Sequence, residues 1–273
     1  MAFKISLAGD LGSGKSTVAD ILISRLGAEY YSTGAIVRSI AARHGMSVVE
    51  LNVYMETHPE IDTEIDNGLV ELGNVDKPMV IDSRMAWHFT KGTFKVYLST
   101  DVETSALRIM NANRVGEHSA SLEETIAQTK ARRESEKKRY STQYGVDIKD
   151  LTNYSLIVDT TVANPEQVAE CILTSFAEWQ KNPEFSAVYI SGERINYPDD
   201  APDGELVEEY AARLAEEDEV PEVTVFENEG EFYLESGAEA ALAHSFGDEV
   251  LFRARLVRGS AEGKKYVKMK NSL

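Results

Sequence analysis

Short apolar runs alternate with helical repeats along the first 180 residues. Apolar runs of about four to eight residues predict buried strands, and apolar positions at three- to four-residue spacing predict helices. We predict strands at residues 3–8, 29–31, 78–82, 93–98 and 154–158. Helices are predicted between and after them, at about 18–26, 36–41, 47–57, 60–72, 101–111, 121–140 and 165–179. This alternation predicts an α/β fold, a five-stranded parallel sheet with helices on both faces.

The pattern changes after residues 181–184, Lys-Asn-Pro-Glu, which we interpret as a domain boundary. Beyond it we predict strands at 187–190, 222–226, 231–234, 250–257 and from Lys265 on, with helices at 204–215 and 237–244. The segment 228–230, Asn-Glu-Gly, predicts a hairpin turn. We therefore divide the chain into residues 1–181 and a small α+β domain at 187–273, and expect a chain that ends at Asn182 to fold.

The charge of the chain limits the classes of partner. The formal net charge is −18, with 18 Lys and Arg against 25 Asp and Glu in residues 1–180 and 10 against 21 in residues 181–273. General nucleic-acid binding needs a basic surface, so it is not expected, and any anion site must be local. No apolar run is long enough to span a membrane. With the single Cys171 and no predicted targeting segment, this pattern predicts a cytoplasmic protein.

Residues 9–16, Gly-Asp-Leu-Gly-Ser-Gly-Lys-Ser, match the phosphate-binding loop G-x-x-x-x-G-K-[ST]. They follow a predicted strand and precede a predicted helix, which is the context that this loop requires. Its N–H groups can converge on phosphate oxygens at a helix N-terminus. We expect Lys15 to reach the β- and γ-phosphates of a nucleoside triphosphate and Ser16 to ligate Mg²⁺. The expected nucleotide-binding residues are Gly9, Gly12, Ser13, Gly14, Lys15, Ser16 and Thr17.

A second anion site is predicted close to this loop. Ser32, Gly34 and Arg38 follow the second strand and suit an acceptor phosphate or sugar, or else they cap a helix. Asp82 ends a buried strand and is placed to hold Mg²⁺ through water. Arg84, two positions on, could clamp an acceptor phosphate. The alternative for Asp82 is a turn at the end of the strand.

A basic run at residues 130–139 stands out in this acidic chain. It contains Arg132, Arg133 and Arg139 together with Glu134 and Glu136. The arginines could close over the phosphates as a lid. The interspersed glutamates leave open a salt-bridged helix face. Asp147, shortly after this run, could contact the acceptor base or the lid, or cap a helix.

With these motifs in place, most of residues 1–180 resembles the archaeal-type branch of the cytidylate kinases, which are P-loop nucleoside monophosphate kinases. The shared segments are Gly9–Thr17, Ser32–Arg38, His58–Asp66, Ile81–Arg84 and Arg133–Thr160. The resemblance implies transfer of the γ-phosphate of ATP to CMP or dCMP, with ATP and Mg²⁺ as cofactors and a nucleoside monophosphate as the second substrate.

The resemblance also implies a role for individual residues. Lys15 and Ser16 would hold ATP with Mg²⁺, Ser32 and Arg38 would contact the acceptor, and Arg84 would bind its phosphate. Arg133 and Arg139 would belong to the lid, and Arg108 would lie near the ATP base. The implied catalytic residues are Lys15, Arg84, Arg133 and Arg139, and Mg²⁺ would be held by Ser16 and Asp82. Ser83 departs from the family pattern, which has glycine there.

Residues 187–260 more weakly resemble the ParB/sulfiredoxin-like fold. The likeness lies in Ile190–Ile195, the helix at 204–215, the hairpin, and Ser236–Ala241. Ala240 stands where active members carry an arginine, so we expect a non-catalytic module that binds a protein partner or forms a dimer. The alternative is an unrelated α+β extension.

Two other functions are open at this point. The chain could phosphorylate another small acceptor, such as a modified nucleotide or a metabolite. It could also be a nucleotide-binding regulatory protein whose acidic tail binds a partner. A pure binding module has no need of Arg38, Arg84, Arg133 and Arg139 together, which favours phosphoryl transfer.

Overall fold

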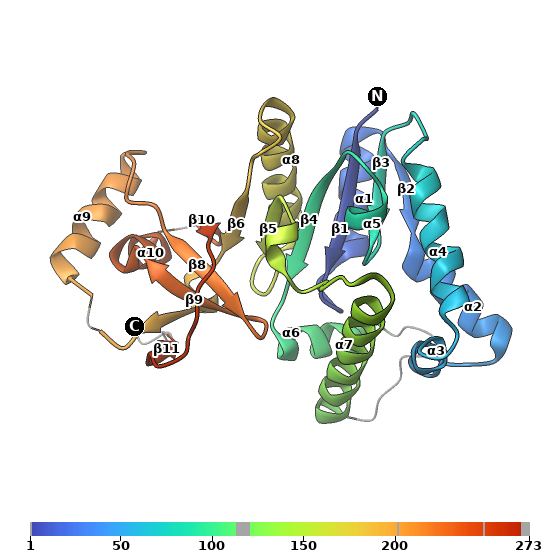
Figure 1. Ribbon diagram of the computed structural model, residues 1–273. Helices are drawn as coiled ribbons and strands as arrows, with labels where there is room; N and C mark the ends of the chain where they lie inside the picture. Colours follow the sequence, from blue (N-terminus) through green and yellow to red (C-terminus); the bar gives the residue numbers. More distant parts are fainter. Residues whose placement is uncertain (1, 113–120, 201, 248, 269–273) are drawn as a thin grey trace. The chain divides into compact units, whose positions relative to one another are not determined.

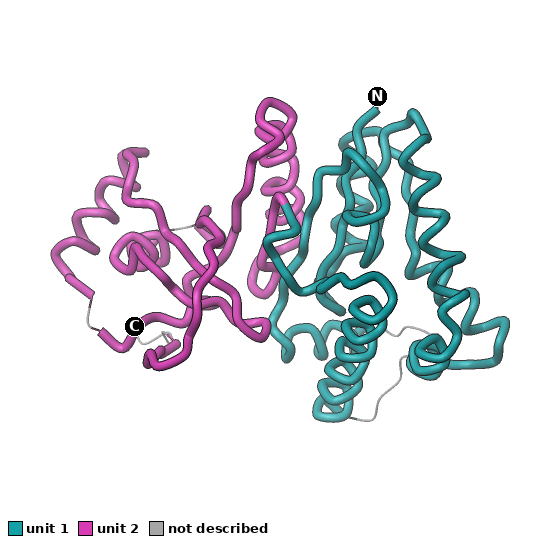
Figure 2. The backbone as a smooth tube through the Cα atoms, in the orientation of Figure 1, with its two compact units in different colours: residues 1–154 teal, residues 155–273 magenta. Residues whose placement is uncertain are grey.

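The computed structural model describes residues 2–112, 121–200, 202–247 and 249–268 (Figure 1). Its contacts group the chain into two compact units, Met1–Tyr154 and Ser155–Leu273 (Figure 2). Residues 155–181, which we assigned to the N-terminal domain, therefore group with the C-terminal unit. The boundary at 181–187 stays a prediction about the folding domains.

The N-terminal unit has a parallel sheet. Its strands are β1 (Lys4–Gly9), β2 (Glu29–Ser32), β3 (Met79–Asp82) and β4 (Thr93–Ser99), in the spatial order β4-β1-β3-β2. Leu7 of β1 and Ser32 of β2 are both in register with Asp82 of β3. Because all these strands run in one direction, their carboxyl ends meet at one edge. The segments that follow β1, β2 and β3 are thereby brought together.

The helices of this unit follow the predicted repeats. They are α1 (Lys15–Leu26), α2 (Thr33–His44), α3 (Val48–Met55), α4 (Pro59–Leu72), α5 (Ala86–Phe89), α6 (Val102–Asn111) and α7 (Leu122–Tyr144). Ser32, Ser47 and Asp101 cap α2, α3 and α6 with side-chain oxygens. The short helix α5 was not predicted, because four residues carry no periodicity. Among the described residues, no helix is both long and apolar enough to cross a membrane.

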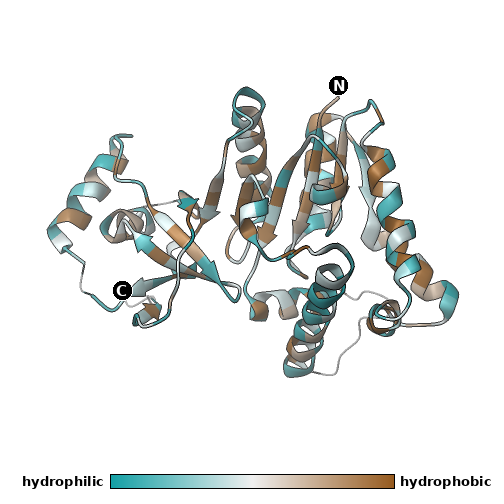
Figure 3. Cartoon of the chain, viewed as in Figure 1, coloured by the Kyte–Doolittle hydropathy of each residue, from teal (hydrophilic) through white to brown (hydrophobic). Residues whose placement is uncertain are grey.

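Two apolar clusters fix the helices that surround the edge of the sheet. One joins Leu69 of α4 to Ile81 of β3 and Tyr140 of α7. The other joins Ile40 of α2, Leu51 and Met55 of α3, and Ile65 of α4. Figure 3 shows hydrophobic colours along β1 and β4 and mostly hydrophilic colours over α7. Helices α2, α3 and α4 therefore form a packed wall, and α7 contributes mainly polar groups.

The C-terminal unit has a mixed sheet. Its strands are β5 (Leu156–Asp159), β6 (Ala187–Ile190), β7 (Ile195–Pro198), β8 (Thr224–Asn228), β9 (Glu231–Ser236), β10 (Phe252–Leu256) and β11 (Tyr266–Lys268), in the order β11-β7-β9-β8-β10-β6-β5. The helices are α8 (Pro165–Lys181), α9 (Gly204–Ala215) and α10 (Ala238–Phe246). The predicted hairpin is confirmed: β8 and β9 are antiparallel, and Glu229 and Gly230 in the turn both have positive φ. Strand β7 was not predicted.

The predicted five-stranded sheet is wrong in its strand count. β5 pairs in parallel with β6, with Leu156 opposite Ala187, so the sheet continues into strands that we assigned to a separate domain. The polar segment 181–184 lies between α8, which ends at Lys181, and β6, which begins at Ala187. A buried ion pair reinforces the connection, since Arg194 Nε lies 3.0 Å from Asp159 Oδ2. Both features lie across the predicted boundary, and the folding of a chain that ends at Asn182 stays a prediction.

Candidate active site

The loop between β1 and α1 depends on glycine at two crowded positions. Gly9 has φ +144°, and a Cβ there would lie 2.4 Å from the carbonyl oxygen of Leu98. Gly12 has φ +72°, and its Cβ would lie 2.5 Å from the carbonyl oxygen of Ser105. Only glycine fits such positions without displacing backbone. The loop leads directly into the N-terminus of α1, an arrangement that suits an anion.

Lys15, the first residue of α1, folds back over this loop. Its Nζ donates to the carbonyl oxygens of Gly9 (3.2 Å) and Asp10 (2.6 Å) and to Ser13 Oγ (3.3 Å). Burial, together with the neighbouring Arg84 cation, lowers the pKa of Lys15 to about 7. A bound anion would favour the charged form of Lys15 and so oppose both effects, which suits this loop to phosphate.

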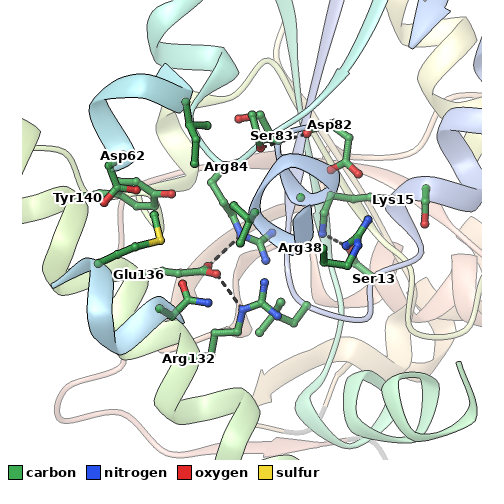
Figure 4. A pocket seen from close by; sticks show the side chains of 18 of the residues that line it. Ser13, Lys15, Arg38, Asp62, Asp82, Ser83, Arg84, Arg132, Glu136 and Tyr140 are labelled. Atoms are coloured by element: carbon green, nitrogen blue, oxygen red, sulfur yellow. Dashed lines mark hydrogen bonds and ion pairs between the residues drawn. The ribbon is translucent and has the colours of Figure 1, made fainter. Parts of the chain in front are cut away.

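A central cleft opens at the edge where the strands end. Figure 4 shows its side chains, which come from the loop, α2, α3, α4, α7 and the segment after β3. The residues that line it include Gly12, Gly14, Lys15, Ser16, Gly34, Arg38, Asn52, Met55, Asp62, Ile65, Asp66, Asp82, Arg84, Arg132, Glu136, Arg139 and Tyr140. The parallel register of β1, β2 and β3 explains why three segments far apart in sequence share this cleft.

Arg84 and Glu136 occupy the middle of the cleft. Arg84 donates to the carbonyl oxygen of Gly9 and, through Nε, to Glu136 Oε2 at 2.9 Å. Glu136 Oε1 accepts from Arg132 Nε at 3.1 Å. Burial alone would raise the pKa of Glu136, but Arg84 and Arg132 outweigh it and bring the pKa to about 2. Glu136 is therefore an ionised residue that holds two arginines of the site in place.

Two carboxylates of α4 form the other end of the cleft, which we call the acid end (Asp62 and Asp66). Arg139 Nε lies 2.9 Å from Asp62 Oδ2, and Arg139 also donates to Asn52 Oδ1 at 3.3 Å. In Figure 4, Asp62 and Tyr140 lie on one side, Lys15 and Asp82 on the other, and Arg84 and Glu136 between them. The cleft thus has a cationic loop end and an anionic acid end.

A smaller pocket adjoins the loop next to Asp10. The Asp10 carboxylate accepts from Tyr97 Oη (2.9 Å), from the backbone N–H of Thr100 (3.1 Å) and from Lys149 Nζ. A guanidinium nitrogen of Arg133 lies 3.5 Å from Asp10 Oδ1. Burial opposes ionisation, but Lys149 and Arg133 hold the pKa of Asp10 well below its usual range. Sequence reasoning missed Lys149, because nothing around position 149 marks it as a partner of the loop.

The predicted lid arginines separate in the structure. Arg132 and Arg139 line the central cleft, whereas Arg133 lines the smaller pocket. Both pockets share Arg84 and Glu136. The roles of Arg133 and Arg139 at the transferred phosphate stay predictions, as does the catalytic role of Lys15 and Arg84.

Some of the predicted acceptor-binding residues line the central cleft, and others do not. Gly34 and Arg38 line the central cleft, and Ser32 caps α2 by accepting from the N–H of Ala35 at 3.3 Å. Asp147 is exposed, and its carboxylate accepts from the N–H of Lys149 at 2.8 Å, which is a turn-capping contact. Asp147 is not among the described residues that line the cleft.

Three further residues singled out in the sequence, Thr17, Arg108 and Ser83, lie outside the centre of the cleft or make local contacts. Thr17 is exposed on the first turn of α1, and Arg108 lies in the last turn of α6; neither is among the described lining residues of the central cleft. Ser83 is buried, and its Oγ accepts from the N–H of Met85 at 3.2 Å. The serine that replaces the usual glycine thus caps the turn before α5.

The oxygen groups next to Lys15 suit Mg²⁺. Ser16 and Asp82 both line the cleft, and Asp82 Oδ2 accepts from Tyr30 Oη at 3.1 Å. Within the described residues there is no group of three or more His, Cys, Asp or Glu side chains that could hold a metal ion. One hydroxyl and one carboxylate fit a magnesium ion that takes its remaining ligands from phosphate and water.

Comparison with known proteins shows the family of this chain. Residues 4–162 match the cytidylate kinase-like family. Cytidylate kinase of Thermoplasma volcanium is 32% identical over 193 residues, which cover 69% of this chain and 99% of the relative. That of Archaeoglobus fulgidus is 37% identical over 171 residues, which cover 62% and 92%.

A solved structure, shikimate kinase from Bacteroides thetaiotaomicron, aligns with a TM-score of 0.47 at 15% identity, over 64% of this chain and 98% of that one. A likeness at this level says nothing about the acceptor. The family match covers the loop, the acid end and both pockets. The chain therefore belongs to the cytidylate kinase-like family and is an ATP-dependent kinase.

Proposed function

We propose that this protein transfers the γ-phosphate of ATP to CMP or dCMP, giving ADP and CDP or dCDP. The observation that carries the proposal is the continuous cleft between the loop end and the acid end. One end suits the phosphates of a nucleoside triphosphate, and the arginines between the ends suit the phosphate of an acceptor. The family membership supports a nucleoside monophosphate as that acceptor.

In this proposal the loop end binds and orients the donor. The N–H groups at the start of α1 and the Lys15 cation bind the β- and γ-phosphates. Ser16 and Asp82 would hold Mg²⁺, which neutralises charge on the phosphates when bound. Lys15 must leave the loop carbonyl oxygens to reach the phosphates, so nucleotide binding replaces three internal contacts.

The middle of the cleft would serve the transfer itself. An oxygen of the acceptor phosphate forms a bond to the γ-phosphorus as the bond from that phosphorus to the bridging oxygen of ADP breaks. Arg84 and Arg132 lie between the two binding ends and would stabilise the charge of the transferred group. Glu136 keeps both arginines oriented before substrate arrives.

The remaining alternatives differ in their acceptor. Another small acceptor would use the same loop end, and a regulatory nucleotide-binding protein would need no acceptor at all. Arg38, Arg84 and Arg132 converge in one cleft, which a nucleotide switch does not require. The role of the C-terminal unit, as a dimer interface or a site for a protein partner, stays a prediction.

The test is an ADP-release assay with ATP and Mg²⁺ over CMP, dCMP, UMP, AMP, GMP, shikimate and gluconate. We expect CMP or dCMP to give the highest kcat/KM. Preferred turnover of shikimate or gluconate would replace the acceptor in the proposal. ATP binding without turnover of any acceptor would favour the regulatory alternative.

A further inference from the structure

The acid end of the central cleft contains a buried carboxylate oxygen without a hydrogen-bond donor in the described part of the chain. Asp66 is 6% exposed and lines the cleft from α4. Tyr144 hydrogen-bonds the Asp66 carboxylate, but Oδ2 has no hydrogen-bond partner among the residues that the structure describes. A buried acceptor atom without a donor is costly, so this oxygen is suited to a donor supplied by a ligand.

The charges around Asp66 also favour a hydrogen-bond donor from a ligand. Arg139, whose charge also acts on Asp66, already pairs with the neighbouring carboxylate of Asp62. Burial raises the pKa of Asp66 to about 6, and the charge of Asp62 acts in the same direction. A neutral N–H donor would stabilise the carboxylate without bringing a second charge into the cleft.

The walls next to Asp66 suit a flat ring. Val37, Met55 and Ile65 supply apolar side chains, and the ring of Tyr140 lines the same cleft. An acceptor whose phosphate lies near Arg84 would direct its base toward this end, since Arg84 lies between Lys15 and Asp62 (Figure 4). The polar groups that distinguish one acceptor base from another would then be those of the acid end.

Pyrimidine bases differ in the group that they offer a carboxylate. Cytosine carries an exocyclic amino group at C4, which donates, whereas uracil carries a carbonyl oxygen there, which only accepts. Resting on the function proposed above, we propose that Asp66 selects the acceptor base by accepting a hydrogen bond from its 4-amino group and by repelling a 4-carbonyl oxygen. Asp66 is thus a specificity-determining residue, and Asp62 with Arg139 positions the wall that presents it.

The first experiment exchanges the carboxylate for an amide. In Asp66→Asn the side-chain NH₂ can donate to the uracil oxygen, so the ratio of kcat/KM for CMP to that for UMP should fall by about tenfold or more, with part of the change a gain for UMP. Asp66→Ala should lower the ratio without a gain for UMP. Glu64→Gln is the matched control, because Glu64 is an exposed carboxylate on the same helix, and it should keep the wild-type ratio.

The second experiment leaves the protein unchanged. The wild-type chain is assayed with CMP and with the 2-pyrimidinone ribonucleoside monophosphate, which lacks any group at C4. We expect kcat/KM for this analogue to be at least about tenfold below that for CMP. This result does not depend on whether the variants fold.

The outcomes separate the two proposals. If the wild-type chain phosphorylates no nucleoside monophosphate, the proposed function fails, and the role of Asp66 fails with it. If it phosphorylates CMP but the analogue is used equally well, or folded Asp66→Asn keeps the wild-type ratio, only the role of Asp66 is overturned.

Discussion

The two ends of the central cleft are built in different ways. The loop end comes from one contiguous segment, in which backbone N–H groups, two crowded glycines and Lys15 form the site. The acid end consists of Asp62 and Asp66 of α4. The apolar clusters that pack α4 against α3 and α7, and the ion pair between Asp62 and Arg139, hold it in place. The first end is a property of local backbone geometry and the second is a property of tertiary packing.

This difference suggests that the two ends have different functions in substrate recognition. A site made of backbone groups and one cation recognises what all nucleoside triphosphates share, namely phosphates. A site made of side chains on packed helices can distinguish one acceptor from another. Changes at the loop end should therefore reduce activity with every acceptor, whereas changes at the acid end should alter the preference among acceptors. Four substitutions test this contrast, from the largest expected effect to the smallest.

Lys15→Met should have the largest effect. It keeps the length of the side chain but removes the cation that the loop presents to the phosphates, so kcat should fall by about a thousandfold or more with every acceptor. The ADP-release assay measures this. Lys137→Met, at an exposed position of α7, is the control and should retain activity. An unequal loss among acceptors in Lys15→Met would break the contrast between the two ends.

Arg84→Ala should lower kcat by about 100- to 1,000-fold, because its guanidinium lies between the donor and acceptor ends. It also leaves Glu136 with Arg132 as its one remaining ion-pair partner among those that Figure 4 shows. The free energy of unfolding should therefore drop by about 1–3 kcal/mol.

The companion variant Arg84→Ala/Glu136→Gln separates these two effects. It should recover most of the lost stability in urea unfolding but none of the activity. Recovery of activity would mean that Arg84 acts only as a partner of Glu136.

Asp62→Asn should have a smaller and selective effect. Arg139 would lose its charged partner, and the wall that holds Asp66 would loosen. We expect KM for the acceptor to rise by about tenfold while KM for ATP stays unchanged. Initial rates at varied ATP and varied acceptor distinguish the two constants. A matching rise in KM for ATP would contradict a separate acid end.

The last prediction concerns stability and its dependence on pH, not activity. The folded-state pKa of Asp66 is about 6, against an ordinary value of 3.8, so between about pH 4 and pH 6 the folded state binds more protons than the unfolded chain. The free energy of unfolding therefore falls as pH rises through this window, by about 3 kcal/mol in total from Asp66. The groups that set this balance are Asp62, Arg139 and Tyr144.

Asp66→Asn removes that titration. Its free energy of unfolding, relative to wild type, should rise from pH 4 to pH 6 and then level off, as measured by urea denaturation at each pH. Glu64→Gln should show no such rise, and a flat difference for Asp66→Asn would mean that Asp66 titrates normally.

The loop end could be predicted from sequence because its geometry is local. The conformation of the loop is determined by the spacing of Gly9, Gly12, Gly14 and Lys15. Helix caps such as Ser32, Ser47 and Asp101 are also determined by residues that are close in sequence. Apolar runs predicted most of the strands, but an apolar run does not indicate which strand pairs with it in the sheet. The pairing of β5 with β6 was therefore missed.

The acid end and Glu136 could not be assigned in this way. Asp62 and Asp66 were visible in a family-like segment, but their role depends on how α4 packs between α3 and β3. Glu136 looked like part of a salt-bridged helix face, and one of its partners is indeed Arg132, four residues away. Its other partner, Arg84, is 52 positions away and reaches it only through the fold.

Helix α7 links the phosphate-binding loop to the acid end through its ion pairs. Arg133 contacts Asp10 of the loop, and Arg139 contacts Asp62 of α4. A ligand that shifts one of these contacts also shifts the helix that carries the other, so the two binding events should share a coupling free energy. By thermodynamic reciprocity, a non-hydrolysable ATP analogue must change the Kd of CMP by the same factor by which CMP changes the Kd of the analogue. The affinity that one substrate gains or loses from the other would then depend on this one helix.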